Sequence, residues 1–169
     1  MCGIAGILTR SNKYKDDIRE NLGRIIHRIE HRGPDGIGFW CDPENRIALA
    51  HARLAIIDLS NGGRQPMTSL SGRYVLTFNG EIYNYIELRQ KLIEAGVKFR
   101  GTSDTEVLLE SIEHWGLEKA LKLTKGMFAL AVWDVKKEVL CLARDRVGKK
   151  PLYVYDSDKV LIFSSEIKG

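Results

Sequence analysis

The chain has 169 residues with 26 basic and 22 acidic side chains, a formal net charge of +4, and its length suits one domain with a hydrophobic core of its own. The charges are scattered along the sequence, so the composition predicts no nucleic-acid partner and no charged membrane-binding patch. No apolar segment is long enough to span a membrane, so no membrane partner is predicted either. The three scattered cysteines exclude a disulfide framework and a zinc site built on cysteine spacing, and they favour a reducing cytoplasm.

The first elements in chain order are a strand, a helix and a hairpin. The apolar run at 4–8 predicts a buried strand that starts almost at the first residue, so the N-terminus is interpreted as structure rather than as a targeting signal. Over residues 14–31, isoleucine and leucine recur every three or four positions, which is typical of an amphipathic helix. Strand-like runs follow at 37–41 and 47–54, and the turn-rich residues between them predict a hairpin.

The middle of the chain predicts a long loop, a strand and two helices. Residues 58–72 are dense in glycine, serine, asparagine and proline, and a loop of this length inside a compact domain often carries function. The apolar run at 74–78 predicts the strand. One helix is expected at 84–95, where Asn84 resembles an N-cap, and another at 103–115, which opens with the serine and glutamate of a capping box.

The last part of the chain, after Gly126, changes to short apolar runs at 128–133, 139–143, 152–155 and 160–163. These runs predict four strands separated by charged or glycine- and proline-containing turns. Together with the helical blocks before them, they indicate an α+β layered fold. No glycine-rich pattern of the P-loop or dinucleotide-binding kind occurs, so the sequence predicts no ATP chemistry in these residues.

Cys2 is the first candidate for chemistry. If Met1 is removed, Cys2 carries a free α-amine whose ordinary pKa is about 8, close to the thiol's value of about 8.5. The amine can then take the thiol proton, and the thiolate can attack an amide carbonyl to form a thioester. An intact Met1 would prevent this because an amide nitrogen is not basic. Taken alone, Cys2 is more often a small core residue, which is how we interpret Cys41 and Cys141.

Several further motifs occur together with this cysteine, and the combination is that of a known family. In chain order they are M-C-G-I-A-G-I at 1–7, H-R-G-P-D at 31–35, A-H-A-R-L at 50–54, F-N-G-E-I-Y-N at 78–84, G-T-S-D-T-E at 101–106, G-M-F-A at 126–129, R-D-R-V-G-K-K-P-L-Y at 144–153 and S-S-E-I-K at 164–168. Over its whole length the chain resembles a class II glutamine amidotransferase. Within that class, H-R-G-P-D and R-L-A-I-I-D are most similar to glutamine-hydrolysing asparagine synthetase.

The resemblance implies a particular fold and domain organisation. The fold would be that of the N-terminal-nucleophile hydrolases, a four-layer αββα sandwich of two antiparallel sheets between helices. Residues 1–169 would form one glutaminase domain, and an ATP-dependent synthetase domain would follow C-terminally. Because the S-G-G-x-D-S-like loop of that second domain is missing, the chain is expected to be a fragment of a longer protein. ATP and magnesium are expected only in the missing domain, and no metal or cofactor is expected here.

The resemblance also implies roles for individual residues. Asn79 and Gly80 match an oxyanion-hole pair, a side-chain amide and a backbone N–H. Arg53 matches the residue that binds the α-carboxylate of glutamine, and Asp104 matches the carboxylate that receives its α-ammonium group. Each has a simpler interpretation: a tight turn for Asn79 and Gly80, a surface salt bridge for Arg53, and the dipole of a helix start for Asp104.

Weaker matches extend the expected site. Leu54 and Ile56 match positions whose backbone lines the glutamine pocket, and Glu81 matches a residue at the substrate end, although packing explains these three equally well. The H-R-G-P-D segment at 31–35 can be a helix stop, and in the family it lies close to the nucleophile. His51, like the other histidines, shows no metal-ligand spacing and is interpreted as a packed or surface residue.

The predicted reaction is glutamine plus water giving glutamate plus ammonia, which passes to the synthetase domain for the synthesis of asparagine from aspartate. Three alternatives stay open. The domain can feed the amidation of another carboxylate, such as a sugar acid, or it can be a non-catalytic docking or regulatory domain that retains Met1. It can also be an amidase for another amide, against which Arg53, Asn79 and Asp104 together argue. Glutamine and the synthetase domain are the expected partners, and a homodimer is left open.

Overall fold

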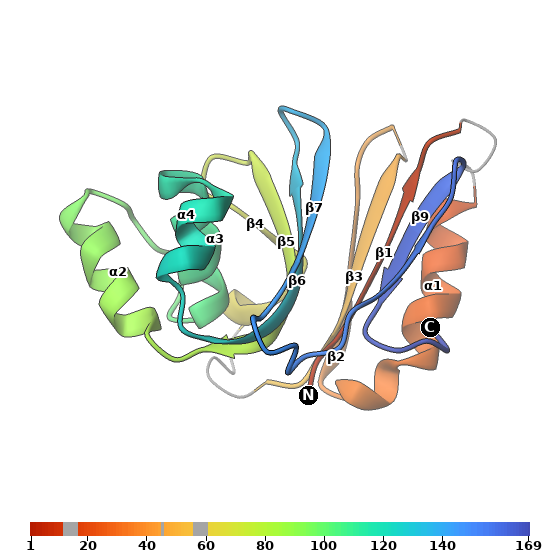
Figure 1. The fold of residues 1–169 in the computed structure, drawn as a ribbon, viewed down its shortest axis with the longest axis horizontal. Helices are drawn as coiled ribbons and strands as arrows, with labels where there is room; N and C mark the ends of the chain where they lie inside the picture. The colour runs from red at the N-terminus through yellow and green to blue at the C-terminus, as the bar shows by residue number, and fades with distance from the viewer. Residues whose placement is uncertain (12–16, 45, 56–60) are drawn as a thin grey trace.

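The computed structural model of the chain describes residues 1–11, 17–44, 46–55 and 61–169. In chain order the elements are β1 (Gly3–Thr9), α1 (Ile18–Arg28), η2 (Glu30–Arg32), β2 (Gly36–Cys41), β3 (Ile47–Arg53), η3 (Asn61–Gly63), β4 (Met67–Thr68), β5 (Tyr74–Ile82), α2 (Tyr85–Glu94), α3 (Asp104–Trp115), α4 (Leu117–Leu123), β6 (Gly126–Asp134), β7 (Val139–Arg144), β8 (Tyr153–Asp156) and β9 (Val160–Ser164). Within these residues the strands form two antiparallel sheets, stacked face to face with helices on their outer sides (Figure 1). This arrangement confirms the expected four-layer α+β fold.

The first sheet has β1 at its centre. Its strand order is β2-β3-β1-β9-β8, and every neighbouring pair is antiparallel. In the register of this sheet, Ala5 lies between Ala50 of β3 and Ser164 of β9. Because β1 runs opposite to both neighbours, its first residues lie beside the last residues of β3 and β9. The N-terminus therefore emerges between the ends of two other strands.

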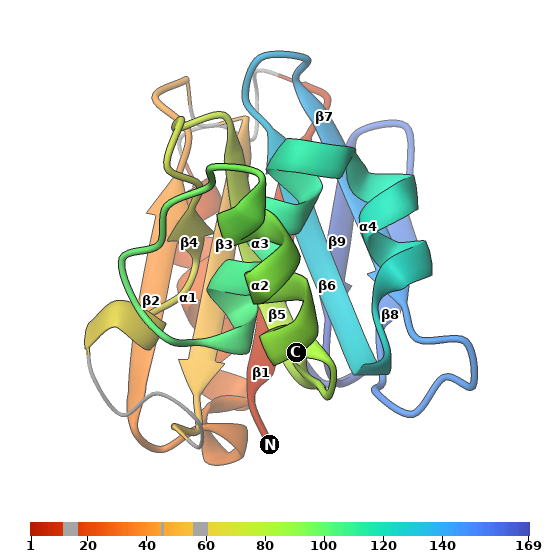
Figure 2. The same ribbon diagram turned by 90° about the vertical axis from the view of Figure 1, so that its left-hand side faces the viewer.

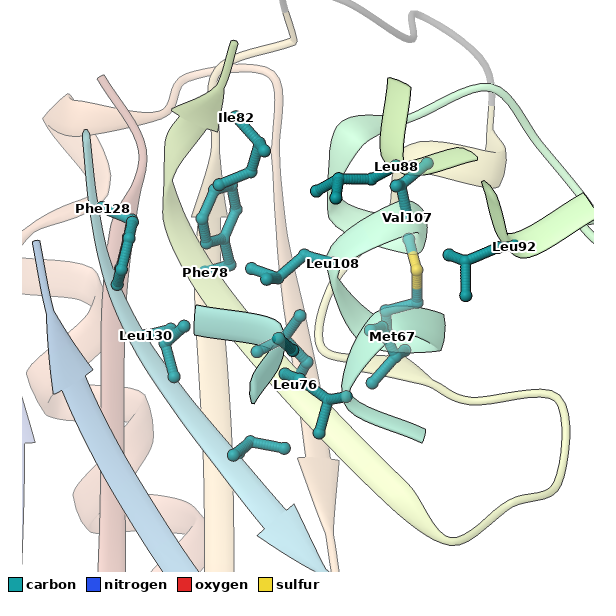
Figure 3. Close-up of a cluster of buried hydrophobic side chains, with 14 residues drawn as sticks. Met67, Leu76, Phe78, Ile82, Leu88, Leu92, Val107, Leu108, Phe128 and Leu130 are labelled. Carbon is teal, nitrogen blue, oxygen red and sulfur yellow. The ribbon is translucent and has the colours of Figure 1, made fainter. Parts of the chain in front are cut away.

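The second sheet has the order β4-β5-β6-β7 and carries the other helix layer. Figure 2 shows α2, α3 and α4 covering the outer face of this sheet, whereas α1 covers the outer face of the first sheet in Figure 1. A cluster of buried apolar side chains fills the space between the helices and the strands, with Leu76 and Phe78 of β5 facing Leu108 of α3 (Figure 3). This cluster fixes β5 and the start of α3 relative to each other.

The unbroken apolar run at the start of the chain is explained by burial of both faces of β1. Ala5 and Ile7 belong to the cluster under α1, whereas Ile4 belongs to the cluster between the two sheets. All three side chains are almost inaccessible to solvent. A strand covered on both faces has no solvent side that would require polar residues, so its sequence is continuously apolar.

The two predicted helix starts differ in how they are capped. At α3, the Ser103 hydroxyl accepts a hydrogen bond from the backbone N–H of Glu106 at 3.2 Å, which confirms Ser103 as the N-cap. The Glu106 carboxylate accepts instead from the backbone N–H groups of Arg100 and Gly101, at 2.7 and 2.8 Å. At α2, the Asn84 side chain makes no cap bond; its Nδ2 donates to the carbonyl oxygen of Leu123, the last residue of α4, at 3.0 Å, and its Oδ1 accepts from the Lys125 N–H at 2.8 Å.

We expect Ser103→Ala to lower the free energy of unfolding by about 1 kcal/mol, because a buried N–H of the first turn of α3 loses its acceptor. Urea denaturation measures this change. Thr102→Ala is the matched control, since it removes an exposed hydroxyl one residue earlier and should change the free energy of unfolding by less than about 0.5 kcal/mol. Equal losses in the two variants would contradict the capping role of Ser103.

Some elements differ from their expected bounds. β5 spans Tyr74–Ile82 rather than 74–78, because β6 pairs with it along its whole length. α4 and β4 were not expected, and at seven and two residues they are too short to show a periodic pattern. The helix expected at 14–31 appears as α1 followed by the 3-10 turn η2, and residues 12–16 lie outside the described part. No helix in the described ranges is long and apolar enough to span a bilayer.

Candidate active site

Cys2 stands immediately before β1, at the chain end that emerges between β3 and β9. Its sulfur contacts the backbone of Leu54, whose N–H donates to Sγ at 3.3 Å and whose carbonyl oxygen accepts from the thiol at 3.5 Å. Burial raises the pKa of the Cys2 thiol, while the backbone of Leu54, the terminal ammonium and Arg53 act to lower it. The sulfur is therefore partly buried, fixed in position and close to positive charge.

Two motifs from distant parts of the sequence meet beside Cys2. Arg32, from H-R-G-P-D, donates to the Cys2 carbonyl oxygen at 3.0 Å and forms an ion pair at 2.9 Å with Glu166, from S-S-E-I-K. Next to this pair, the Ile4 N–H donates to the Ser165 hydroxyl oxygen at 2.9 Å. The backbone of the first few residues is thus held by side chains on both flanking segments.

A pocket next to Cys2 is lined by the end of β3, the second half of β5 and the first turn of α3. Of the site residues expected from the sequence, it brings together Cys2, Arg53, Leu54, Asn79, Gly80, Glu81 and Asp104. Ile56, the remaining one, lies outside the described residues. Residues from separate segments of the chain therefore share one cavity.

Asn79 lines the pocket and carries an unpartnered donor. Its side chain is 2% exposed, and Nδ2 has no hydrogen-bond partner among the residues that the structure describes. A buried N–H without an acceptor costs about 1–3 kcal/mol, so this group is suited to bind an oxygen atom of a ligand. Asn79 and Gly80 both lie within β5, so their interpretation as a tight turn is wrong. A Cβ on Gly80 would lie 2.3 Å from the Met127 carbonyl oxygen, which leaves room only for glycine.

Asp104 is a buried carboxylate in the first turn of α3. Its Oδ2 accepts from the Ile82 N–H at 2.9 Å, and its Oδ1 accepts from the Thr105 hydroxyl at 3.5 Å. Burial raises the pKa of Asp104, the two hydrogen bonds act to lower it, and the nearby charge of Glu81 raises it again. None of the ion pairs formed by the described residues includes Asp104. A ligand's ammonium group can supply the missing counter-charge.

Arg53 and Glu81 add charges of opposite sign to the pocket wall. Arg53 ends β3, and its positive charge acts to lower the pKa of the Cys2 thiol. Glu81 follows the oxyanion candidates in β5, and its negative charge acts to raise the pKa of Asp104. A wall with cationic and anionic groups suits a ligand that carries both charges, as a free amino acid does.

Five polar residues of the pocket wall were not expected there: His51, Gln65 and Lys150, and also Ser103 and Thr105 at the start of α3. His51 is 1% exposed and donates from Nε2 to the Phe78 carbonyl oxygen at 3.2 Å; burial lowers its pKa to about 4, so the ring is neutral at physiological pH. Gln65 accepts from the Phe78 N–H at 2.7 Å and donates to the Thr105 hydroxyl at 3.3 Å. Lys150 also lines the pocket. His51 and Lys150 lie inside recognisable motifs, whereas Gln65 carried no signal in the sequence.

Comparisons with known proteins support the resemblance seen in the motifs. Residues 1–169 match the family model described as a glutamine amidotransferase domain. Glutamine-hydrolysing asparagine synthetase 1 of Bacillus subtilis is 42% identical over 170 residues, which cover 100% of this chain and 26% of that protein. Asparagine synthetase 3 of the same organism is 39% identical over 171 residues, covering 100% and 27%. Amidase chry2 of Gibberella zeae is 37% identical over 177 residues, covering 100% and 26%.

A solved structure extends the comparison to the fold. Glutamine phosphoribosylpyrophosphate amidotransferase from B. subtilis superposes with a TM-score of 0.80 and 23% identity, covering 98% of this chain and 42% of that chain. The likeness agrees with the expected N-terminal-nucleophile hydrolase fold. The chain spans about a quarter of the length of the curated relatives named above. Because the family model and these relatives match along its whole length, the chain belongs to the family of glutamine amidotransferase domains.

Proposed function

We propose that this domain hydrolyses glutamine to glutamate and ammonia, with Cys2 as the nucleophile once Met1 has been removed. The observation that carries the proposal is the shared pocket, in which the Cys2 thiol, the Asn79 amide, whose Nδ2 has no partner among the described residues, and the buried Asp104 carboxylate come together. A thiol nucleophile, an oxyanion donor and an anchor for an α-ammonium group are the parts that this reaction needs. The names of the asparagine synthetase relatives support the same reaction.

The proposed chemistry begins with the α-amine of the processed Cys2, which takes the thiol proton. The thiolate attacks the side-chain amide carbon of glutamine, a C–S bond forms, and the oxygen becomes an oxyanion that accepts hydrogen bonds from Asn79 Nδ2 and the Gly80 N–H. The ammonium proton moves to the leaving nitrogen, which departs as ammonia and leaves a thioester. Water, deprotonated by the same amine, then attacks the thioester carbon, the C–S bond breaks to release glutamate, and the ammonium proton returns to the sulfur.

The rest of the pocket is proposed to hold the amino-acid end of glutamine. The Arg53 guanidinium would bind the α-carboxylate, and the Asp104 carboxylate would bind the α-ammonium group. Leu54, which contacts the sulfur through its backbone, and Glu81 also line the pocket, and Ile56 is proposed beside them. Glutamine is then held by both of its charged groups, which positions its amide near the sulfur.

We further propose that the ammonia is used by an ATP-dependent synthetase domain that follows this one, since the chain spans about a quarter of its asparagine synthetase relatives. Aspartate is the acceptor that their names suggest, with ATP and magnesium bound in that second domain. Another carboxylate acceptor is the alternative, and the match to a relative named as an amidase keeps hydrolysis of another amide open as a further one. A reducing cytoplasm suits a free thiol nucleophile, and a homodimer is compatible with this scheme.

Trapping of the acyl intermediate tests the proposed reaction. After intact mass has shown that Met1 is absent, the protein is incubated with glutamine in the presence of hydroxylamine. We expect the hydroxylamine to divert the thioester, so that glutamyl hydroxamate forms at the expense of glutamate. Glutamate release without any hydroxamate would exclude the thioester. A processed, folded protein that binds glutamine without releasing either product, alone or joined to its synthetase domain, would favour the docking or regulatory alternative.

Arg53→Lys is expected to raise KM for glutamine by about tenfold with a much smaller change in kcat, because a single ammonium cannot replace the two parallel hydrogen bonds of a guanidinium to a carboxylate. Steady-state glutamate release measures both constants. Arg64→Lys is the matched control, because Arg64 is an arginine in the described part of the chain outside the pocket wall. An unchanged KM in Arg53→Lys would contradict the assignment of Arg53 to the α-carboxylate.

A further inference from the structure

Lys150 is a buried lysine whose backbone is fixed from two sides. It is 3% exposed and lies between β7 and β8, in the R-D-R-V-G-K-K-P-L-Y motif. Its N–H donates to the Asp145 carboxylate at 3.0 Å, and its carbonyl oxygen accepts from Arg144 Nε at 2.6 Å. The Asp145 carboxylate also accepts from the Phe128 N–H at 3.1 Å, which ties this turn to β6. The side chain therefore starts from a rigid base and reaches into the pocket beside Cys2.

The end of this side chain has an unusual partner. Its ammonium group donates to the Met1 thioether sulfur at 2.6 Å, and this sulfur is its only hydrogen-bond acceptor within the described ranges. A thioether is a weak acceptor, and a buried lysine normally requires a carboxylate or several carbonyl oxygens. The contact with Met1 therefore does not explain why a lysine occupies this position.

Charged groups from several segments of the chain act on Lys150. Burial lowers its pKa, and Arg32 of η2 lowers it further, whereas Cys2, Glu81 of β5 and Asp145 act to raise it. The interaction between Lys150 and Cys2 is mutual, since each group acts on the ionisation of the other. Lys150 is therefore electrostatically coupled to the nucleophile without being hydrogen-bonded to it.

Removal of Met1 changes what surrounds this ammonium group. The thioether departs, and the amide nitrogen of Cys2 becomes an amine at the pocket that Lys150 also lines. A fixed positive charge favours the thiolate over the thiol and the neutral amine over the ammonium. Arg53 acts on Cys2 in the same sense from the side of β3. Both effects favour the ionisation states that the proposed mechanism uses.

We propose that Lys150 is a positioning residue for glutamine hydrolysis, which holds a positive charge beside the processed N-terminus and so prepares the Cys2 amine as a base and the Cys2 sulfur as a nucleophile. This inference rests on the proposed function. Lys150 acts through Cys2 and is not itself in the bond-making steps. Its contribution is therefore largest at low pH, where the amine would otherwise be protonated, and small at high pH.

The test compares the rate at which iodoacetamide alkylates Cys2 across a range of pH in the processed wild type and in Lys150→Met, with the modified residue located by peptide mass. We expect the acid limb of this profile to move to higher pH by about one unit in Lys150→Met, because the removed charge no longer favours the thiolate. Lys149→Met removes the same charge from the exposed neighbour and should leave the limb in place. Lys150→Arg keeps the charge and should restore most of the wild-type profile.

Glutamate release provides the second measurement. At neutral pH, kcat/KM of Lys150→Met should fall about tenfold and should recover as the pH rises. Superimposable alkylation profiles of Lys150→Met and the wild type would overturn the proposal, and so would a loss of activity that is the same at every pH. If Lys150→Met does not fold, Lys150→Gln replaces it in both assays. Alkylation needs no glutamine, so it tests the coupling between Lys150 and Cys2 independently of the proposed function. A wild type without glutaminase activity would refute the proposed function alone.

Discussion

Cys2→Ala is expected to lower glutamate release from glutamine by at least roughly 10,000-fold, because loss of a nucleophile removes the covalent route that the other groups serve. The pocket wall that would hold the amino-acid end of glutamine is unchanged by the substitution. Glutamine should therefore still bind, with a dissociation constant within about threefold of the wild-type value. Activity is measured as glutamate release and binding by calorimetry, on samples whose loss of Met1 has been shown by intact mass.

A second variant separates the amine from the thiol. A chain that keeps one extra residue before Cys2 retains the thiol but has an amide in place of the amine. We expect it to be as inactive as Cys2→Ala, because the proposed base is missing. Cys41→Ala is the matched control, since it removes a cysteine outside the pocket, and it should keep wild-type activity. Wild-type turnover by the extended chain would refute the α-amine as base while leaving Cys2 as nucleophile.

Asn79→Ala is expected to lower kcat by about 100- to 1,000-fold with little change in KM, because the oxyanion forms only after glutamine has bound. The stability should respond differently. Since Nδ2 has no partner among the described residues, its removal leaves no other group unsatisfied, and we expect the free energy of unfolding to change by less than about 1 kcal/mol. Steady-state kinetics and urea denaturation on one sample measure both quantities.

Thr77→Ala is the control for this variant, because it lies two residues earlier in β5. The Thr77 hydroxyl donates to the Ala50 carbonyl oxygen at 3.2 Å and so connects the two sheets. We expect Thr77→Ala to destabilise the protein by about 1 kcal/mol and to retain kcat within about threefold. If Asn79→Ala instead lost stability and kept kcat, its amide would be a structural group and the oxyanion assignment would be wrong.

The sequence predicted most of the fold because local patterns and tertiary burial agree there. The strand at the N-terminus was evident from its apolar run, which reflects cover on both faces of β1. The extension of β5 to Ile82 was not evident, since it depends on pairing with a strand more than forty residues away along the chain. Asn79 and Gly80 were for this reason also compatible with a turn, an interpretation that pairing with β6 excludes.

The candidate site, like the fold, was predictable from the sequence only in part. The motifs identified Cys2, Asn79 and Asp104 individually, and the structure brings them to one pocket. Patterns along the chain carry no information about which donors lack an acceptor, so only the fold shows that the Asn79 amide nitrogen has no partner in the described part of the chain. The sequence also could not predict that Lys150 lies beside Met1. The two residues are at opposite ends of the sequence, and the strand order β1-β9-β8 and the turn before β8 bring them together.

Because β1 is the central strand of the first sheet, the number of residues between Cys2 and β1 is fixed by the structure. β1 begins at Gly3, directly after Cys2, and is hydrogen-bonded to strands on both sides, so the position of Cys2 is set by the register of the sheet. An inserted residue must either project into the pocket or shift β1 by one position, and a shift would exchange the side chains that face α1 with those that face the other sheet. The spacing between Cys2 and β1 should therefore tolerate no insertion or deletion.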